Sequence, residues 1–221
     1  MVFAIYKEMT IRDAYSLWST TYDSDRNLTR DLDQLATASS LGNRSYLNVI
    51  EIGCGTGKNT AFLARIARTI MAIDFSTGML RQAKLKVDSD NVGFVVADLT
   101  NPWPCKQNSF ELIVCNLVLE HVEHLGPIFY EASQALVNEG LFFISELHPF
   151  RQYKGTQANF QRGDQMTEIP AYVHHLSDFT DPAEQNGFSL RVMKEWWDDE
   201  DHAKLPRLIS FTFEKRPQKG T

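Results

Sequence analysis

Three glycines at alternate positions, followed about twenty residues later by an acid, form the pattern with the clearest chemical meaning in this sequence. Gly53, Gly55 and Gly57 follow an apolar run at residues 47–52, and glycines let the backbone turn sharply and approach a ligand closely. Asp74 ends the next apolar run, where a carboxylate can accept hydrogen bonds from both hydroxyls of a ribose. The pattern therefore indicates a site for a ligand that contains a nucleoside.

Two familiar phosphate-binding loops fit the glycine run poorly. A P-loop requires G-x-x-x-x-G-K-[ST], but Ile52 stands five positions before Gly57, and Lys58 is followed by Asn59. A dinucleotide fingerprint, G-x-G-x-x-G, would need its third glycine at position 58, which Lys58 occupies. The P-loop is therefore excluded, and NAD or FAD is disfavoured without being ruled out.

The loop resembles the first motif of the class I S-adenosylmethionine-dependent methyltransferases, E-x-G-x-G-x-G, which Glu51 and the three glycines match at every position. The resemblance implies S-adenosylmethionine as the cofactor and S-adenosylhomocysteine as its product. It also implies a set of cofactor-binding residues: Glu51, Gly53, Cys54, Gly55, Gly57, Asp74, Phe75, Met79, Asp98, Leu99, Asn116 and Leu117.

Later segments extend the resemblance over about residues 47 to 215. In that family an acid at the position of Asp98 bonds the adenine amino group, and Asn116 would face the methionine part of the cofactor. Residues 110–122 resemble the family's D-x-V-x-x-x-x-x-L-E-H-V segment, with Glu111 where aspartate is commonest. The sequence most resembles the branch that contains ubiquinone and menaquinone biosynthesis methyltransferases, whose N-terminal Y-D pair is matched by Tyr22 and its neighbour.

Methyl transfer from a sulfonium requires mainly alignment and exclusion of water, and a base only when the acceptor must lose a proton. His121 and His148 follow the fourth and fifth predicted strands, and either could be that base. Alternatively, His121 only positions the loop over the cofactor, and His148 bonds the backbone beside Pro149. The adjacent pair His174-His175 cannot direct both rings to one site if extended, so we expect no metal site.

Aromatic and basic residues in two segments outside the predicted sheet are candidates for binding the acceptor. Small-molecule sites combine such aromatics with a few polar groups, and an arginine can pair bidentately with an acidic acceptor. The alternative is that the aromatics only pack a lid and the arginines are solvated. The candidates are Tyr15, Trp18, Tyr22, His148, Arg151, Tyr153 and Tyr172, with Phe150, Phe160, Arg162, Trp196 and Trp197 nearby.

The elements that position these residues alternate between β-rich runs and helical periods, which is typical of a parallel sheet built from βα units. We expect strands at 47–52, 70–73, 92–96, 110–115 and 140–145, helices at 57–68, 76–87 and 124–138, and β-runs at 187–197 and 208–215. The predicted fold class is α/β, a Rossmann-like, doubly wound, seven-stranded, mostly parallel sheet with an antiparallel C-terminal hairpin.

We expect one domain over residues 1–221, divided by role along the chain. Residues 1–40 would form a helical lid, 41–146 the cofactor-binding half, 147–177 a substrate-lid insertion after the fifth strand, and 178–221 a helix and the strand hairpin. Both lid segments could reach the carboxyl ends of the strands, where ligands bind in open α/β sheets.

Composition limits the partners. The formal net charge of -6 argues against binding of nucleic acid. The three cysteines Cys54, Cys105 and Cys115 form no C-x-x-C pair, which favours a reduced, cytoplasmic location. No apolar stretch reaches about 18 residues, so we expect no membrane span, and the protein is expected to be a monomer or homodimer.

The sequence thus predicts a methyltransferase that acts on a small molecule by in-line displacement. Two alternatives stay open, namely methylation of a macromolecule such as RNA or protein, and binding of S-adenosylmethionine by a scaffold without turnover. No N-P-P-Y tetrad follows the fourth strand, where Asn116-Leu117-Val118-Leu119 stands instead.

Overall fold

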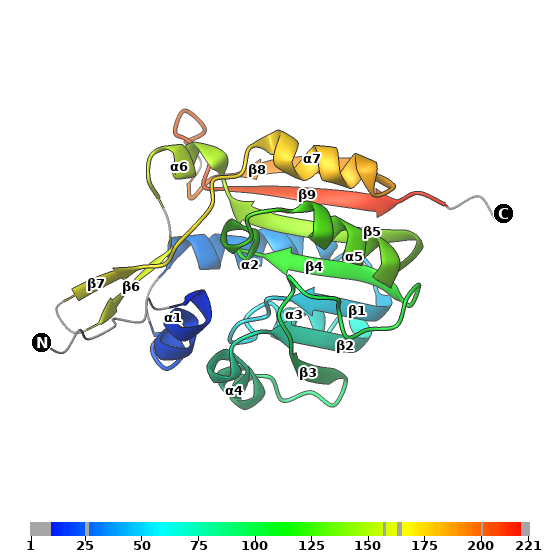
Figure 1. The fold of residues 1–221 in the computed structure, drawn as a ribbon, viewed down its shortest axis with the longest axis horizontal. Coiled ribbons are helices and arrows are strands. Elements are labelled where there is room, and N and C mark those ends of the chain that lie inside the picture. The colour runs from blue at the N-terminus through cyan, green and yellow to red at the C-terminus, as the bar shows by residue number, and fades with distance from the viewer. Residues whose placement is uncertain (1–9, 25–26, 157, 163–164, 200, 218–221) are drawn as a thin grey trace, which may run out of the picture.

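A seven-stranded sheet runs through the centre of the molecule (Figure 1), with the strand order β3-β2-β1-β4-β5-β9-β8. The computed structural model describes residues 10–24, 27–156, 158–162, 165–199 and 201–217. β1 to β5 are parallel, whereas β9 is antiparallel to both β5 and β8. The predicted fold class is confirmed. The strands are β1 (Tyr46–Ile52), β2 (Ala67–Asp74), β3 (Val92–Val96), β4 (Phe110–Asn116), β5 (Leu136–Leu147), β8 (Phe188–Trp196) and β9 (Leu208–Lys215).

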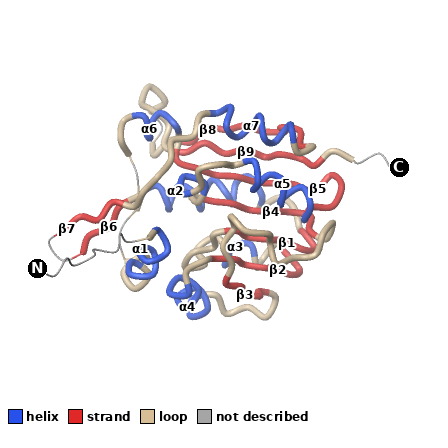
Figure 2. Tube along the Cα trace, in the orientation of Figure 1, coloured by secondary structure: helices blue, strands red, loops and turns tan. Residues whose placement is uncertain are grey.

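Helices cover both faces of the sheet, as Figures 1 and 2 show. One face carries α2 (Leu28–Leu41), α3 (Thr60–Leu63) and α4 (Thr77–Lys86), and the other carries α5 (Gly126–Ala135) and α7 (Leu176–Gln185). Side chains alternate between the faces along each strand. In β4, Leu112 and Val114 pack in one core cluster, whereas Ile113 and Cys115 pack in the other. Such double burial explains the nearly continuous apolar runs of the parallel strands.

The helix expected at 57–68 is much shorter in the structure. α3 ends at Leu63, and β2 already begins at Ala67. Tyr46 at the start of β1 pairs with Ala67, and its N–H donates to the carbonyl of Ile66 at 2.8 Å. Pairing with the neighbouring strand therefore overrides the local helical pattern.

The N-terminal helix α1 (Ile11–Trp18) lies at the edge of the sheet where β1 to β4 end (Figure 1). A capping box between Thr10 and Asp13 begins this helix. Gly78 of α4 allows close packing, because a Cβ there would lie 3.1 Å from the carbonyl oxygen of Ser16.

The insertion after β5 forms α6 (Pro149–Tyr153), β6 (Asn159–Arg162) and β7 (Gln165–Glu168), and the last two pair as a separate antiparallel hairpin. The residues that flank this hairpin pack on α1, where Ile169 and Ala158 contact Ala14 and Trp18. Both segments predicted as lids therefore meet at the carboxyl edge of the sheet. Among the described residues, no helix has both the length and the apolar character needed to cross a bilayer.

Candidate functional site

A cavity of about 480 Å³ lies between the carboxyl ends of the parallel strands and helices α1 and α2. Its volume falls in the usual range for small-molecule sites. The glycine loop is part of its lining, and so are residues from α1, α2 and the loop after β4. Of the predicted cofactor-binding residues, the following line it: Glu51, Gly53, Cys54, Gly55, Asp74, Phe75, Met79, Asp98, Leu99, Asn116 and Leu117.

The glycine loop has the backbone conformation that its sequence predicts. The φ angles of Gly53, Gly55 and Gly57 are +69°, +55° and +81°, in the region that side chains disfavour. A Cβ on Gly53 would lie 2.2 Å from Cγ2 of Val118, whereas a Cβ on Gly55 would meet nothing within 4 Å. Gly53 is therefore required by the protein's own packing, and the open space beside Gly55 leaves room for a ligand. Gly57 lies outside the lining and packs against α4.

Asp74 joins the end of β2 to this loop. Its Oδ2 accepts from the N–H of Gly55 at 2.9 Å, and its Oδ1 accepts from the N–H of Ser76 at 2.8 Å. The carboxyl is buried, and burial raises its pKa to about 6. Asp74 therefore holds the loop while still lining the cavity.

At the end of β3, Asp98 connects the sheet to α1. Its Oδ1 accepts from the backbone N–H and the hydroxyl of Thr100, and its Oδ2 accepts from Arg12 at 3.3 Å. The Arg12 guanidinium lies 5.7 Å from the ring centroid of Phe75. One end of the cavity is thus bounded by an aromatic ring, an acid and a cation.

Two buried glutamates, Glu51 and Glu146, form hydrogen bonds beside the cavity. Glu146 was not predicted as a site residue from the sequence. Glu51 accepts a hydrogen bond from the Thr60 hydroxyl. Oε1 of Glu146, near the end of β5, accepts from the N–H groups of Val118 and Leu119, each at 2.9 Å. Burial raises the pKa of each glutamate to about 8. Glu146 thereby holds the loop after β4, in which Leu117 has a φ of +55°.

Asp33 of α2 is a further buried acid that sequence reasoning missed. It lines the cavity and accepts hydrogen bonds from the amides of Asn59 and Asn116. Asn116 was predicted, but its partner lies 83 residues away in the chain, so no local pattern pointed to it.

His121 contacts α1 and the insertion at the same time. Its Nε2 lies 2.7 Å from the hydroxyl of Tyr15, and its Nδ1 lies 2.9 Å from the carbonyl oxygen of Pro170. A carbonyl only accepts, so Nδ1 carries the proton and the Tyr15 hydroxyl donates to Nε2. Burial lowers the pKa of His121, which keeps the ring neutral near pH 7. His121 and Tyr15 both line the cavity.

His148, the other candidate base, lies outside the cavity lining. It is 2% exposed, its Nε2 contacts Oε1 of Glu195 at 2.9 Å, and its Nδ1 accepts from the N–H of Phe150 at 3.2 Å. Both ring nitrogens are therefore engaged, and the ring begins α6 as its N-cap.

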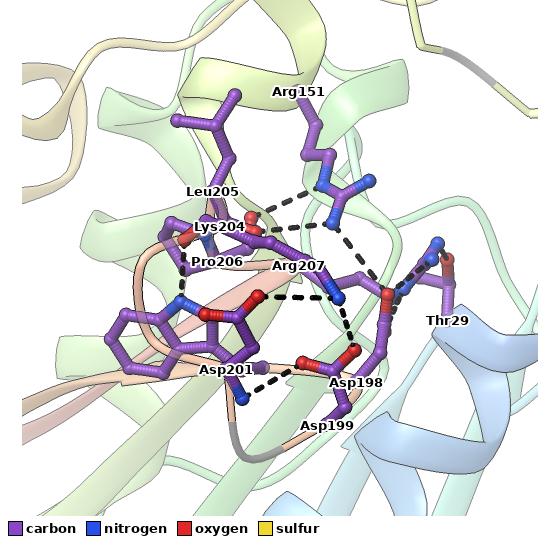
Figure 3. Close-up of polar contacts among 10 residues, drawn as sticks. Thr29, Arg151, Asp198, Asp199, Asp201, Lys204, Leu205, Pro206 and Arg207 are labelled. Carbon is purple, nitrogen blue, oxygen red and sulfur yellow. Dashed lines mark hydrogen bonds and ion pairs between the residues drawn. The ribbon is translucent and has the colours of Figure 1, made fainter.

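Arg151 also lies away from the cavity, at the turn between β8 and β9 (Figure 3). It donates to the carbonyl oxygens of Leu205 and Pro206 and lies 3.6 Å from Asp198. Arg207 pairs with the same Asp198 and donates to the Thr29 hydroxyl of α2. This cluster joins the C-terminal hairpin to α2 and α6.

Of the other predicted acceptor-binding residues, Tyr22 lines the cavity and Trp18 packs beside it, whereas Tyr153 and Tyr172 lie outside the lining and are partly exposed. Phe160 and Arg162 lie outside the residues whose side chains are described. His174 is buried, with Nε2 near the carbonyl oxygens of Leu119 and Val122. Among the described residues, no group of three or more His, Cys, Asp or Glu could hold a metal.

The match to a known protein family includes the glycine loop and the strand ends that line this cavity. Residues 50–144 match the family model of a methyltransferase domain, and this span contains the glycine loop, Asp74, Asp98 and Asn116. The chain belongs to the class I S-adenosylmethionine-dependent methyltransferases. Its cofactor is S-adenosylmethionine.

Relatives of this methyltransferase include an uncharacterized methyltransferase of Emericella nidulans, 27% identical over 80% of this chain and 75% of that protein. A ubiquinone biosynthesis O-methyltransferase of Xanthomonas oryzae pv. oryzae is 28% identical over 62% of this chain, which spans only 57% of that relative. The fold is similar to that of the N-methyltransferase NodS from Bradyrhizobium japonicum in complex with S-adenosylhomocysteine, with a TM-score of 0.70 and 15% identity over 93% and 98% of the two chains.

Proposed function

We propose that this methyltransferase transfers the methyl group to a small-molecule acceptor. The observation that carries the proposal is that α1 covers part of the cavity and is bonded on two sides. The hydroxyl oxygens of Ser16 and Ser76 are 3.0 Å apart, and the Tyr15 hydroxyl is hydrogen-bonded to His121. A site beneath a docked helix suits a small acceptor better than the surface of a folded macromolecule.

The resemblance to ubiquinone biosynthesis O-methyltransferases supports the same proposal. In the bound state, the cofactor supplies an activated methyl group on its sulfonium. We assign the ribose to Asp74 and the adenine end to Asp98 and Leu99, because these residues line one continuous cavity beside the glycine loop.

Tyr15 and His121 would accept a proton from the acceptor if methylation requires the acceptor to lose one. An acceptor hydroxyl or amine beside Tyr15 would give its proton to the phenolic oxygen while the Tyr15 proton moves to Nε2 of His121. Pro170 holds the Nδ1 proton throughout, which keeps Nε2 available as a base. Because the imidazole must be neutral, the rate is expected to fall at acid pH.

Transfer of a labelled methyl group into a cell extract, separated by size, tests the proposal. We expect the label in the small-molecule fraction when purified protein and labelled S-adenosylmethionine are added. Label in RNA or protein alone would contradict a small acceptor. No transfer together with tight binding of S-adenosylhomocysteine would favour a scaffold without turnover.

Tyr15→Phe tests the proton pathway, because it removes only the hydroxyl that bonds His121. We expect turnover to fall by about 100-fold or more for an acceptor that loses a proton, with little change in affinity for S-adenosylhomocysteine. Tyr130→Phe is the matched control, since Tyr130 lies exposed on α5. Equal turnover in both variants would remove Tyr15 from the mechanism.

A further inference from the structure

The hydroxyl of Thr56 joins three elements that surround the cavity. Thr56 belongs to the glycine loop, is 1% exposed and lines the cavity. Its Oγ1 donates to Oδ1 of Asp23 at 2.8 Å and accepts from Nζ of Lys86 at 3.1 Å. Asp23 follows α1 in the chain, and Lys86 ends α4. Because an ammonium group only donates, the hydroxyl proton is directed at Asp23, and the two contacts fix its orientation.

An ion pair closes this group of three side chains, because Oδ2 of Asp23 lies 2.5 Å from Nζ of Lys86. Both charged side chains are partly exposed, and ion pairs in contact with water contribute little stability on their own. A hydrogen bond from a buried hydroxyl to a charged group contributes more. The bond between Thr56 and Asp23 is therefore the stronger restraint, and it ties the glycine loop to the segment after α1.

The restraint on Asp23 reaches α1 through the preceding residue. Tyr22 lines the cavity, and its N–H donates to the carbonyl oxygen of Trp18, the last residue of α1, at 2.9 Å. The Tyr22 and Trp18 rings pack edge to face, with their centroids 4.6 Å apart. Asp23 therefore helps to hold both a wall of the cavity and the end of the helix that covers part of it.

The other end of the restraint lies in the part of the glycine loop that is open to a ligand. Gly55, next to Thr56, lines the cavity and has open space where a Cβ would lie. A ligand that orders Gly55 also orders the neighbouring hydroxyl of Thr56. Ordering one segment lowers the entropic cost of ordering a second segment that is bonded to it.

We infer that Asp23 and Thr56 are positioning residues for methyl transfer, because their hydrogen bond couples occupation of the glycine loop to docking of α1. This inference rests on the proposed function of the same cavity, in which Tyr15 of α1 lies beside the acceptor. Coupling between two sites is reciprocal. Cofactor at the glycine loop should therefore hold α1 in place, and a docked α1 should hold the cofactor.

Hydrogen exchange of the α1 amides, measured with and without S-adenosylhomocysteine, tests this coupling without relying on turnover. In the wild type, the ligand should slow exchange at residues 11–18 by about tenfold or more, the factor expected for one hydrogen bond to a charged group. Thr56→Val keeps the shape of the side chain but removes the hydroxyl. In this variant the slowing at α1 should be at least about threefold smaller, while the ligand still protects the glycine loop.

Three further variants separate coupling from a general loss of stability. Thr56→Ser keeps a hydroxyl and should restore the wild-type response. Asp23→Ala removes the same bond from its partly exposed side, so it replaces Thr56→Val if that variant does not fold. Thr69→Val is the matched control, because Thr69 lies exposed on β2 and its hydroxyl donates to Oδ1 of Asn48 at 2.6 Å. It also loses one hydrogen bond, but the response of α1 to the ligand should stay unchanged.

Turnover gives a second measurement that a purely structural role would not change. At saturating S-adenosylmethionine, Thr56→Val and Asp23→Ala should lower kcat by about tenfold, because an undocked α1 removes Tyr15 from the acceptor. Thr56→Ser and Thr69→Val should remain close to the wild type.

The outcomes distinguish this inference from the proposed function. If S-adenosylhomocysteine binds but does not slow exchange in α1 of the wild type, the coupling is absent and the inference is wrong. The inference is also wrong if the ligand slows α1 equally in the wild type, Thr56→Val and Asp23→Ala. If the wild type does not bind S-adenosylhomocysteine at all, the proposed function itself fails.

Discussion

Replacing Asp74 with asparagine separates its hydrogen bonds to the backbone, which the structure shows, from the ribose binding that we propose for it. Its oxygens accept from the N–H groups of Gly55 and Ser76 at 2.9 and 2.8 Å. The amide of asparagine has only one oxygen, so one of the two N–H groups would lose its acceptor. We expect the free energy of unfolding to decrease by about 1–3 kcal/mol, toward the lower value if water in the cavity reaches Gly55.

Replacing Asp74 should weaken the binding of S-adenosylhomocysteine more than replacing an exposed acid does. If Asp74 accepts both ribose hydroxyls, its loss should weaken S-adenosylhomocysteine binding by at least about 1.4 kcal/mol, or tenfold, in both the asparagine and the alanine variant. Calorimetric titration at pH 8 measures the affinity, and urea unfolding measures the stability. Asp90→Asn, at an exposed acid before β3, is the matched control.

The pH dependence gives an independent check. Burial raises the pKa of Asp74 to about 6, and donors on the ribose favour its ionised form. The wild-type affinity should therefore fall as the pH is lowered through 6, and this component should be missing in Asp74→Asn. An asparagine variant that is folded and binds as tightly as the wild type at pH 8 would refute the ribose assignment.

Three further predictions follow from neighbouring contacts. Gly53→Ala would place a Cβ 2.2 Å from Val118, so its free energy of unfolding should fall by at least about 2 kcal/mol. Gly55 has open space beside it, so Gly55→Ala should lose only about 1–2 kcal/mol. Equal losses in urea unfolding would contradict the packing argument. Burial raises the pKa of Glu146 from 4.5 to about 8, so the folded state holds more protons between these values and stability should decrease as the pH rises. Glu146→Gln should reduce the slope of the unfolding free energy against pH, between pH 5 and 8, by up to about 1.4 kcal/mol per pH unit. An unchanged slope would show that Glu146 is not neutral in the folded wild type. His148→Asn should lower stability by about 1–3 kcal/mol and leave S-adenosylhomocysteine affinity unchanged; a large loss of turnover in a fully stable variant would instead support a role as base.

Local sequence was sufficient for the parts of the site that lie within one βα unit. The glycine loop and Asp74 could be predicted because backbone conformation and strand ends leave direct traces in residue type. The strands of the parallel sheet were recognisable because burial on both faces makes each an apolar run. The helix after the glycine loop was predicted too long, since the pairing of Tyr46 with Ala67 is a tertiary contact.

Tertiary structure alone decided which distant groups share the cavity. The two histidines have similar sequence contexts, but His121 bonds Tyr15 inside the cavity and His148 bonds Glu195 outside it. Asp33 reaches Asn116 across 83 residues, and no periodic pattern records such a contact. The sequence thus determined the glycine loop and the acid at the end of β2, through short-range backbone geometry. The packing of α1 and α2 onto the sheet decided which further side chains line the cavity, because those contacts between distant segments exist only in the folded chain.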